Sequence, residues 1–139
     1  MIAWDASSLI SALDPDEPAH ARAKSLLESS VRHGGSVLLR VEVRGRMHRR
    51  LRSSPRRARQ MDETLQELWA RFSLVPLLDD EAKLAERLAA THLLRGADAV
   101  HLAAALGFAS KMGKKHVRFA SGDQEQLSAA SREGLRVIA

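Results

Sequence analysis

Residues 2–8, IAWDASS, place a carboxylate at the end of a short apolar run. The run at 2–4 predicts a buried strand, and the apolar residues that recur after it at helical spacing predict a helix over 7–13. Asp5 lies at the junction between the two. An ionised group at the edge of a hydrophobic core is costly unless other groups hold it, so a donor or a cation must compensate the Asp5 carboxylate.

Strands and helices continue to alternate along the rest of the chain. Gly and Pro residues separate the segments, and His33-Gly34-Gly35 in particular indicates the end of a helix. The sequence predicts strands at 2–4, 37–39, 73–77, 116–120 and 135–138, and helices at 7–13, 17–32, 41–53, 56–72, 80–94, 97–110 and 123–132. Such alternation is typical of a sheet covered by helices on both faces, so we expect an α/β fold with a mainly parallel sheet.

Composition restricts the class of protein. The 139 residues are 45% hydrophobic, which suits one domain over residues 1–139 with a sizeable core. The chain has no cysteine, so disulfides and thiolate metal sites are excluded. The richest apolar stretch, at 102–109, is far too short to span a bilayer. We therefore expect a cytoplasmic protein that is not associated with a membrane.

The net charge of +5 is concentrated in one segment. Residues 44–59, RGRMHRRLRSSPRRAR, contain eight arginines and no acid, whereas the rest of the chain has 14 basic and 17 acidic residues. Such a segment is typical of a surface that binds a polyanion such as nucleic acid, or an acidic protein partner. The alternative is a solvated helix whose inner side carries Val43, Met47 and Leu51.

Four acidic residues stand at predicted helix starts. Asp5 follows the first predicted strand, Glu42 the second and Asp123 the fourth, and Asp98 opens a helix. Each one alone is explained by helix capping, which contributes about 0.5–2 kcal/mol. Ordinary first-turn acids are also predicted at 16–17, 62–63 and 79–81.

The four acids taken together indicate more than capping. The carboxyl ends of parallel strands meet at one edge of a sheet, where ligands bind. Carboxylates gathered there repel one another and stay ionised only with a cation among them. Oxygen ligands without cysteine favour Mg²⁺ or Mn²⁺ over zinc. A metal ion is therefore the cation that we expect beside Asp5.

The chain resembles the PIN-domain ribonucleases, especially the VapC-type toxins of bacterial toxin–antitoxin pairs. The resemblance covers essentially the whole chain and is carried by WDASSLI at 4–10, Glu42, LRGADAVHLAAAL at 94–106 and FASGDQEQLSAASREGLRVI at 119–138. It implies a single PIN-like domain with strand order 3-2-1-4-5, an acidic metal site between the first and fourth strands, and metal-dependent cleavage of RNA. It also implies a cognate antitoxin as partner, and we expect a homodimer.

The resemblance assigns roles to individual residues. Asp5, Asp98 and Asp123 would hold Mg²⁺ or Mn²⁺, and Glu42 would complete the catalytic set as a ligand or as the base that orients water. Ser7 and Ser121 match hydroxyls that the family often carries near its first and last acids. The predicted substrate-binding residues are Ser7, Ser121, Arg44, Arg49, Arg50, Arg56 and Arg57.

Other residues are expected to lie outside this set. Asp79 and Asp80 follow the strand that the order 3-2-1-4-5 places at an edge of the sheet, so they should lie away from the site. His101, one helical turn after Asp98, could orient Asp98 or contact phosphate, but we expect it to be satisfied locally. Arg40 and Ala104 depart from the family pattern without removing a ligand.

Three other classes of protein are compatible with parts of the pattern. A haloacid-dehalogenase-type phosphatase needs a second Asp two residues after the first, where this chain has Ser7. A receiver domain needs an adjacent pair of acids, which the second and third acids do not form. A non-catalytic PIN-like domain that binds RNA or a partner through residues 44–59 is the remaining alternative, and a metal-dependent nuclease assay separates it from the enzyme.

Overall fold

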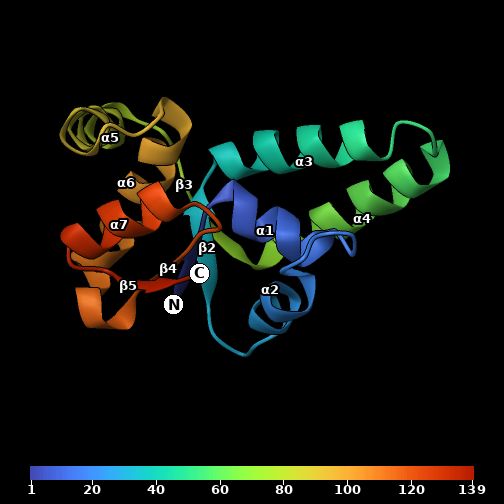
Figure 1. Cartoon of the computed structure of the whole chain (residues 1–139), viewed down its shortest axis with the longest axis horizontal. Helices are drawn as coiled ribbons and strands as arrows, with labels where there is room; N and C mark the ends of the chain where they lie inside the picture. The colour runs from blue at the N-terminus through green and yellow to red at the C-terminus, as the bar shows by residue number, and fades with distance from the viewer.

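The computed structural model describes residues 1–139 and contains one sheet with helices on both of its faces (Figure 1). The strands are β1 (Ile2–Trp4), β2 (His33–Ser36), β3 (Phe72–Val75), β4 (Arg118–Ala120) and β5 (Arg136–Ile138). The helices are α1 (Ala6–Leu13), α2 (His20–Leu27), α3 (Leu38–Arg50), α4 (Pro55–Arg71), α5 (Asp79–His92), α6 (Gly96–Met112) and α7 (Gln124–Arg132), with a short 3₁₀ helix, η1 (Lys114–His116), before β4.

The strands are ordered β3-β2-β1-β4-β5, and every neighbouring pair is parallel. This confirms the predicted α/β class and the predicted strand order. The chain leaves the central strand β1 toward β2 on one side and returns to its other side at β4, so the strand order reverses between β1 and β4. Trp4 pairs with Ala120 at the end of these two strands, and Asp5 and Ser121 therefore leave the sheet beside each other.

Two hydrophobic cores form because alternate side chains of a strand point to opposite faces of the sheet. Ala3 and Phe119 belong to the core shared with α5, α6 and α7, at the left of Figure 1. Ile2 and Trp4 belong to the core shared with α1, α3 and α4, at the right. All four side chains are fully buried. The sheet thus fixes helices from both layers around its carboxyl edge.

The second strand lies earlier in the chain than predicted. The predicted strand at 37–39 is wrong: β2 is formed by His33–Ser36, and residues 38 and 39 already belong to α3. The glycines that indicated a helix end are instead in the sheet, where a Cβ atom on Gly34 would come within 2.6 Å of the Ser73 carbonyl oxygen. As a result, Glu42 lies in the second turn of α3 and not at its start.

Two further predictions differ from the structure. The helix predicted at 17–32 is limited to α2, so the acids at 16–17 precede this helix. The acids at 62–63 lie in the middle of α4, because α4 begins at Pro55 after Ser54 as the N-cap. The acids at 79–81 do form the first turn of α5, as predicted.

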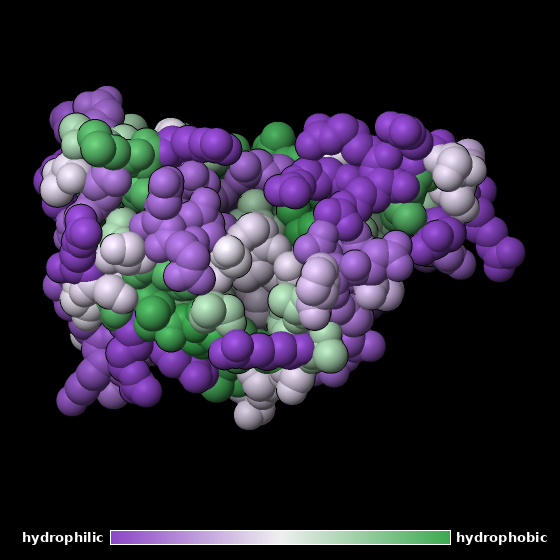
Figure 2. All heavy atoms as spheres, in the orientation of Figure 1, coloured by the Kyte–Doolittle hydropathy of each residue, from purple (hydrophilic) through white to green (hydrophobic).

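The helices α3 and α4 form a hairpin that projects from the body of the molecule (Figure 1). Val43, Met47 and Leu51 are buried on the inner side of α3, as predicted from their spacing. Hydrophilic side chains cover much of the visible face of the hairpin (Figure 2). None of the helices has the length and apolar character needed to cross a bilayer.

Candidate functional site

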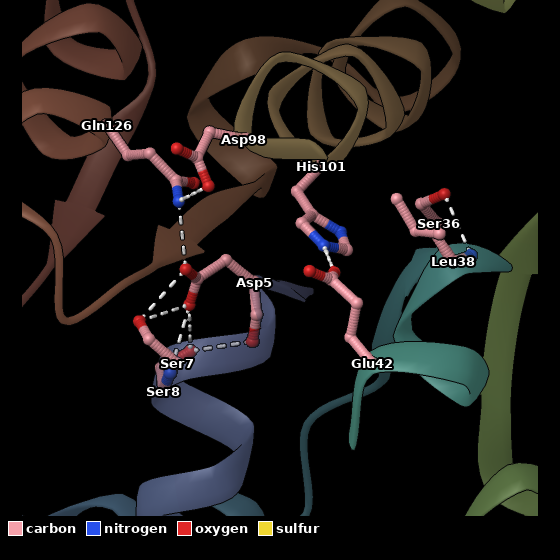
Figure 3. A network of polar contacts seen from close by, with 9 residues as sticks. All are labelled: Asp5, Ser7, Ser8, Ser36, Leu38, Glu42, Asp98, His101 and Gln126. Atoms are coloured by element: carbon pink, nitrogen blue, oxygen red, sulfur yellow. Dashed lines mark hydrogen bonds and ion pairs between the residues drawn. The ribbon is translucent and has the colours of Figure 1, made fainter. Parts of the chain in front are cut away.

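Asp5 is the N-cap of α1, and its carboxylate is held by several donors of the protein (Figure 3). Oδ1 accepts hydrogen bonds from the Ser8 N–H and the Ser8 hydroxyl, both at 2.9 Å. The Ser7 hydroxyl lies 2.9 Å from each carboxylate oxygen, and Oδ2 also accepts the side-chain amide of Gln126 at 3.0 Å. Asp5 is only 2% exposed, so these donors compensate a buried charge as well as capping a helix.

Asp98 and Asp123 come from the starts of two other helices. Asp98 lies in the first turn of α6, where its Oδ1 accepts the Gln126 amide at 2.9 Å. Asp123 is the N-cap of α7, and its Oδ1 accepts the N–H groups of Glu125 at 2.7 Å and Gln126 at 3.4 Å. No protein donor contacts the second oxygen of either carboxylate, so each acid has an oxygen free for a ligand.

The acids interact electrostatically, as the ionisation of Asp98 indicates. Burial raises the pKa of the Asp98 carboxyl above its ordinary value, and the negative charges of Asp123 and Asp5 raise it further. Glu42 contributes in the same direction, whereas His101 opposes it. These are the effects expected of carboxylates gathered in one partly buried place. The charges of Asp5, Glu42 and Asp123 therefore act on Asp98, and a single site formed by the four acids stays a prediction.

Glu42 reaches this site from the second turn of α3 and is bonded to a histidine of α6 (Figure 3). His101 Nε2 lies 2.5 Å from Glu42 Oε2, and His101 is 1% exposed. The expectation that His101 is satisfied locally is wrong, because its partner lies 59 residues away in the sequence. The pair links α3 to α6 across the two helical layers and fixes the direction of the Glu42 carboxylate.

Gln126 is a member of the site that the sequence analysis missed. Its Nε2 bridges Asp5 and Asp98, and its side chain is almost completely buried. The only signal in the sequence is its spacing three residues after Asp123, which places a polar side chain on the inner side of the first turn of α7. A glutamine at such a spacing is common on solvated helices, so the spacing alone did not identify it.

The two predicted serines are both near the acids and hold the turn between β4 and α7. Ser7 Oγ accepts the Gly122 N–H at 2.9 Å while its hydroxyl points to Asp5. Ser121 Oγ accepts the Asp123 N–H at 2.9 Å and is buried. The geometry gives both residues a local structural role, and contact with a substrate stays a prediction.

Comparison with known proteins identifies the family of the chain. The family model of the PIN domain matches residues 2–128, which include all four acids. The chain belongs to the PIN-domain family. No curated protein matches it.

Solved structures support the same fold for this PIN domain. A crystal structure of FitAcB from Neisseria gonorrhoeae superposes with a TM-score of 0.63 at 19% identity, covering 100% of this chain and 97% of that one. A structure of FitAB bound to an IR36 DNA fragment gives a TM-score of 0.67, also at 19% identity, covering 99% of this chain and 94% of that one.

The arginines of the PIN domain at 44–59 fall into two groups. Two of them are paired with acids: Arg44 bonds to Asp62, which also bonds to His48, and Arg50 bonds to Asp14 and Glu17. Hydrogen bonds from Arg44 and then from His48 lower the pKa of Asp62 to about 2. The others have no acidic partner: Arg46, Arg49, Arg52, Arg56, Arg57 and Arg59.

Two of these unpaired arginines, Arg46 and Arg49, share a face of α3 with Glu42. Arg46 and Arg49 follow Glu42 by four and seven residues, a spacing that aligns side chains along one face of a helix. Arg46, Arg49 and Arg52 also line the same hollow at the end of α3. A row of free positive charge therefore leads from the acids toward the tip of the hairpin.

The donors of this PIN domain suit a hard divalent cation. Carboxylate oxygens from three aspartates and the amide oxygen of Gln126, which is buried without a partner, are the ligands that Mg²⁺ and Mn²⁺ prefer. No three of the acidic or histidine side chains are arranged as a metal-holding group. Instead, the N–H end of the Gln126 amide contacts Asp5 and Asp98. The chemistry of these residues therefore fits the cation, while the Gln126 amide is bonded to two of the carboxylates that would bind it.

Proposed function

We propose that this PIN domain is a metal-dependent endoribonuclease and the toxin component of a type II toxin–antitoxin pair. The observation that supports it most strongly is the gathering of Asp5, Asp98, Asp123 and Glu42 at the carboxyl edge of the sheet, with the pKa of Asp98 raised by burial and by the other acids. Such mutual repulsion is costly for folding. A site that keeps it is expected to use it to bind a cation.

The residues of the chain divide the chemistry among them. Asp5, Asp98 and Asp123 would hold Mg²⁺ or Mn²⁺, which activates water and stabilises charge on a phosphate when bound. Glu42, directed by His101, would accept the proton of the attacking water. The water oxygen would bond to phosphorus as the bond between phosphorus and the 3′ oxygen breaks. The 3′ oxygen would take a proton from solvent and become a hydroxyl, and the other product would keep the 5′-phosphate.

The arginines at 44–59 would hold the RNA backbone. Arg49, Arg56 and Arg57 are exposed and unpaired, so their charge is available to phosphates. Arg44 and Arg50 were predicted to act in the same way, and they would have to share their guanidinium groups between RNA and the acids that they already bond. Ser7 and Ser121 would contact the substrate near the acids.

Partners are proposed on the family resemblance and on the neighbours in structure. A cognate antitoxin is the expected partner, and the neighbour described as FitAB bound to a DNA fragment is an example of this fold in an assembly with DNA. The homodimer and the cytoplasmic location stay predictions. A non-catalytic domain that binds RNA or a partner only through its arginines is the alternative.

Cleavage of single-stranded or looped RNA by the purified protein tests the proposal. We expect cleavage with Mg²⁺ or Mn²⁺, none with EDTA, and products that carry a 5′-phosphate, because water and not the 2′-hydroxyl is the nucleophile. End-labelling of the products identifies these groups. Full activity in EDTA, or products with a 2′,3′-cyclic phosphate, would contradict the proposed mechanism, and metal-independent binding without cleavage would support the alternative.

A further inference from the structure

Gln126 makes contacts that the proposed chemistry does not require. Its Nε2 donates to Asp5 Oδ2 at 3.0 Å and to Asp98 Oδ1 at 2.9 Å, and so joins two carboxylates that come from different helices (Figure 3). The residue is 2% exposed. Its Oε1 is buried and has no hydrogen-bond partner.

The orientation of this amide follows from the charges around it. If the amide were reversed, Oε1 would face two carboxylate oxygens and repel both. The positive end of the amide therefore points to Asp5 and Asp98, and the buried oxygen is left unpaired, which is unfavourable for a buried polar atom. The Gln126 Oε1 atom is therefore unpaired because the Gln126 Nε2 atom donates to both Asp5 and Asp98.

The helix α7 does not depend on Gln126 for its formation. The first turn of α7 is already capped by Asp123, and the helix is anchored by buried Leu127, Ala129 and Ala130. A glutamine that served only packing would be expected to satisfy its oxygen as well. The arrangement is explained by the two carboxylates and not by the helix.

We propose that Gln126 is a positioning residue that takes the place of a cation in the metal-free protein: its N–H group holds Asp5 and Asp98 together and competes with a divalent cation for their oxygens. This inference rests on the proposed metal site. An N–H hydrogen and a cation cannot both occupy the same lone pair, so the amide competes with the metal for Asp5 Oδ2 and Asp98 Oδ1, while Asp98 Oδ2 stays free. Gln126 therefore stabilises the metal-free fold and weakens metal binding.

The substitution Gln126→Met tests this, because methionine has a similar length but no donor. In EDTA the melting temperature should fall by about 5 °C, since two hydrogen bonds to charged groups are lost. Titration calorimetry should show Mn²⁺ binding about tenfold tighter than in the wild type, because the competing donor is gone. The matched control is Gln124→Met, which makes the same change at an exposed position of the same helix and should alter neither quantity.

A second pair of variants keeps the test decisive if Gln126→Met folds poorly. In the Asp98→Asn background the bond to Asp5 remains and the bond to residue 98 loses its charge, so adding Gln126→Met should lower the melting temperature by less than it does in the wild type. An equal loss in both backgrounds would mean that Gln126 only packs, and would overturn the inference. Weaker Mn²⁺ binding by Gln126→Met would make Gln126 a ligand, and would also overturn it.

The outcome for the wild type separates this inference from the proposed function. If Mn²⁺ neither binds to the wild type nor raises its melting temperature, the metal site itself is contradicted, and this inference with it. If the wild type binds Mn²⁺ normally and Gln126→Met behaves like Gln124→Met, the metal site stands and only the role of Gln126 is refuted.

Discussion

At the scale of single residues, charge decided what the sequence could predict. Asp5, Asp98 and Asp123 were identifiable because a carboxylate beside a buried strand or at a helix start needs compensation. Gln126 and His101 were not, because a neutral polar side chain acquires its role only through a partner. Asp5 lies 121 residues from Gln126, and Glu42 lies 59 residues from His101, so no local pattern in the sequence predicts these contacts.

The substitution Asp98→Asn distinguishes a metal ligand from an ordinary first-turn acid of a helix. The Asp98 side chain caps no N–H group of α6, and asparagine keeps an oxygen to accept the Gln126 amide, so the fold should be retained. Because Asp98 is repelled by Asp123 and Asp5, losing its charge should leave the metal-free melting temperature unchanged or higher at neutral pH. Metal affinity and RNA cleavage should fall at least a hundredfold. Melting with and without Mn²⁺, together with a cleavage assay, measures both.

The control for this variant is Asp79→Asn. Asp79 also opens a helix, but it is exposed and bonded only to Lys83. We expect this variant to keep wild-type activity. If Asp98→Asn also cleaves RNA like the wild type, Asp98 only stabilises the start of a helix, and the active site lies elsewhere.

At the scale of elements, α3 shows where sequence patterns mislead. The run Val37-Leu38-Leu39 has the composition of a strand, and the preceding glycines have that of a turn, yet the glycines form β2 and the apolar run begins α3. Close packing at the centre of a parallel sheet favours residues without a Cβ, and this requirement is invisible until the neighbouring strands are placed. The acid on the helix was still identified, because one turn of error leaves it near the same edge.

The faces of α3 predict which arginines bind RNA most strongly. Arg46 and Arg49 lie within two turns of Glu42 and on its face, whereas Arg56 and Arg57 lie beyond the hairpin tip. Replacing Arg46 and Arg49 together by Ala should weaken the binding of a single-stranded RNA in EDTA. It should also flatten the dependence of log K on log salt by about 1.4, the value for two phosphate contacts on a single strand. Fluorescence anisotropy at several salt concentrations gives both quantities.

The pair Arg56→Ala and Arg57→Ala is the matched control, because it removes the same charge from unpaired arginines. Its effect should be smaller, and it should grow with the length of the RNA, since only a longer strand reaches from the acids past the hairpin tip. If both pairs of substitutions weaken the binding of a short RNA equally, the arginines form a diffuse basic surface and not a row that leads from the acids. No loss for either pair would leave this segment as a solvated face or as a surface for the antitoxin.

At the scale of the whole molecule, the alternation of strands and helices was enough to predict an α/β fold, and the family resemblance supplied the strand order. What the sequence could not supply was the register of β2 between β1 and β3, because it depends on packing from both cores at once. Gly34 pairs with Ser73 of β3 and packs against the Phe108 side chain of α6. A Cβ atom added to Gly35 would lie 3.0 Å from the Trp4 carbonyl oxygen. The two glycines allow both helical layers to approach one strand.

This packing predicts opposite effects for two substitutions of glycine by alanine. A Cβ on Gly34 would lie 2.6 Å from the Ser73 carbonyl oxygen and 2.8 Å from the Phe108 ring, and the paired backbone cannot move aside, so Gly34→Ala should destabilise the fold by about 1–3 kcal/mol. Gly107 lies inside α6 with no atom within 4 Å of an added Cβ, so Gly107→Ala should stabilise it by about 1 kcal/mol through helix propensity alone. Urea unfolding in EDTA measures both against the wild type. A Gly34→Ala variant as stable as the wild type would mean that β2 is not held between the two cores, and that the position of Glu42 at the sheet edge needs another explanation.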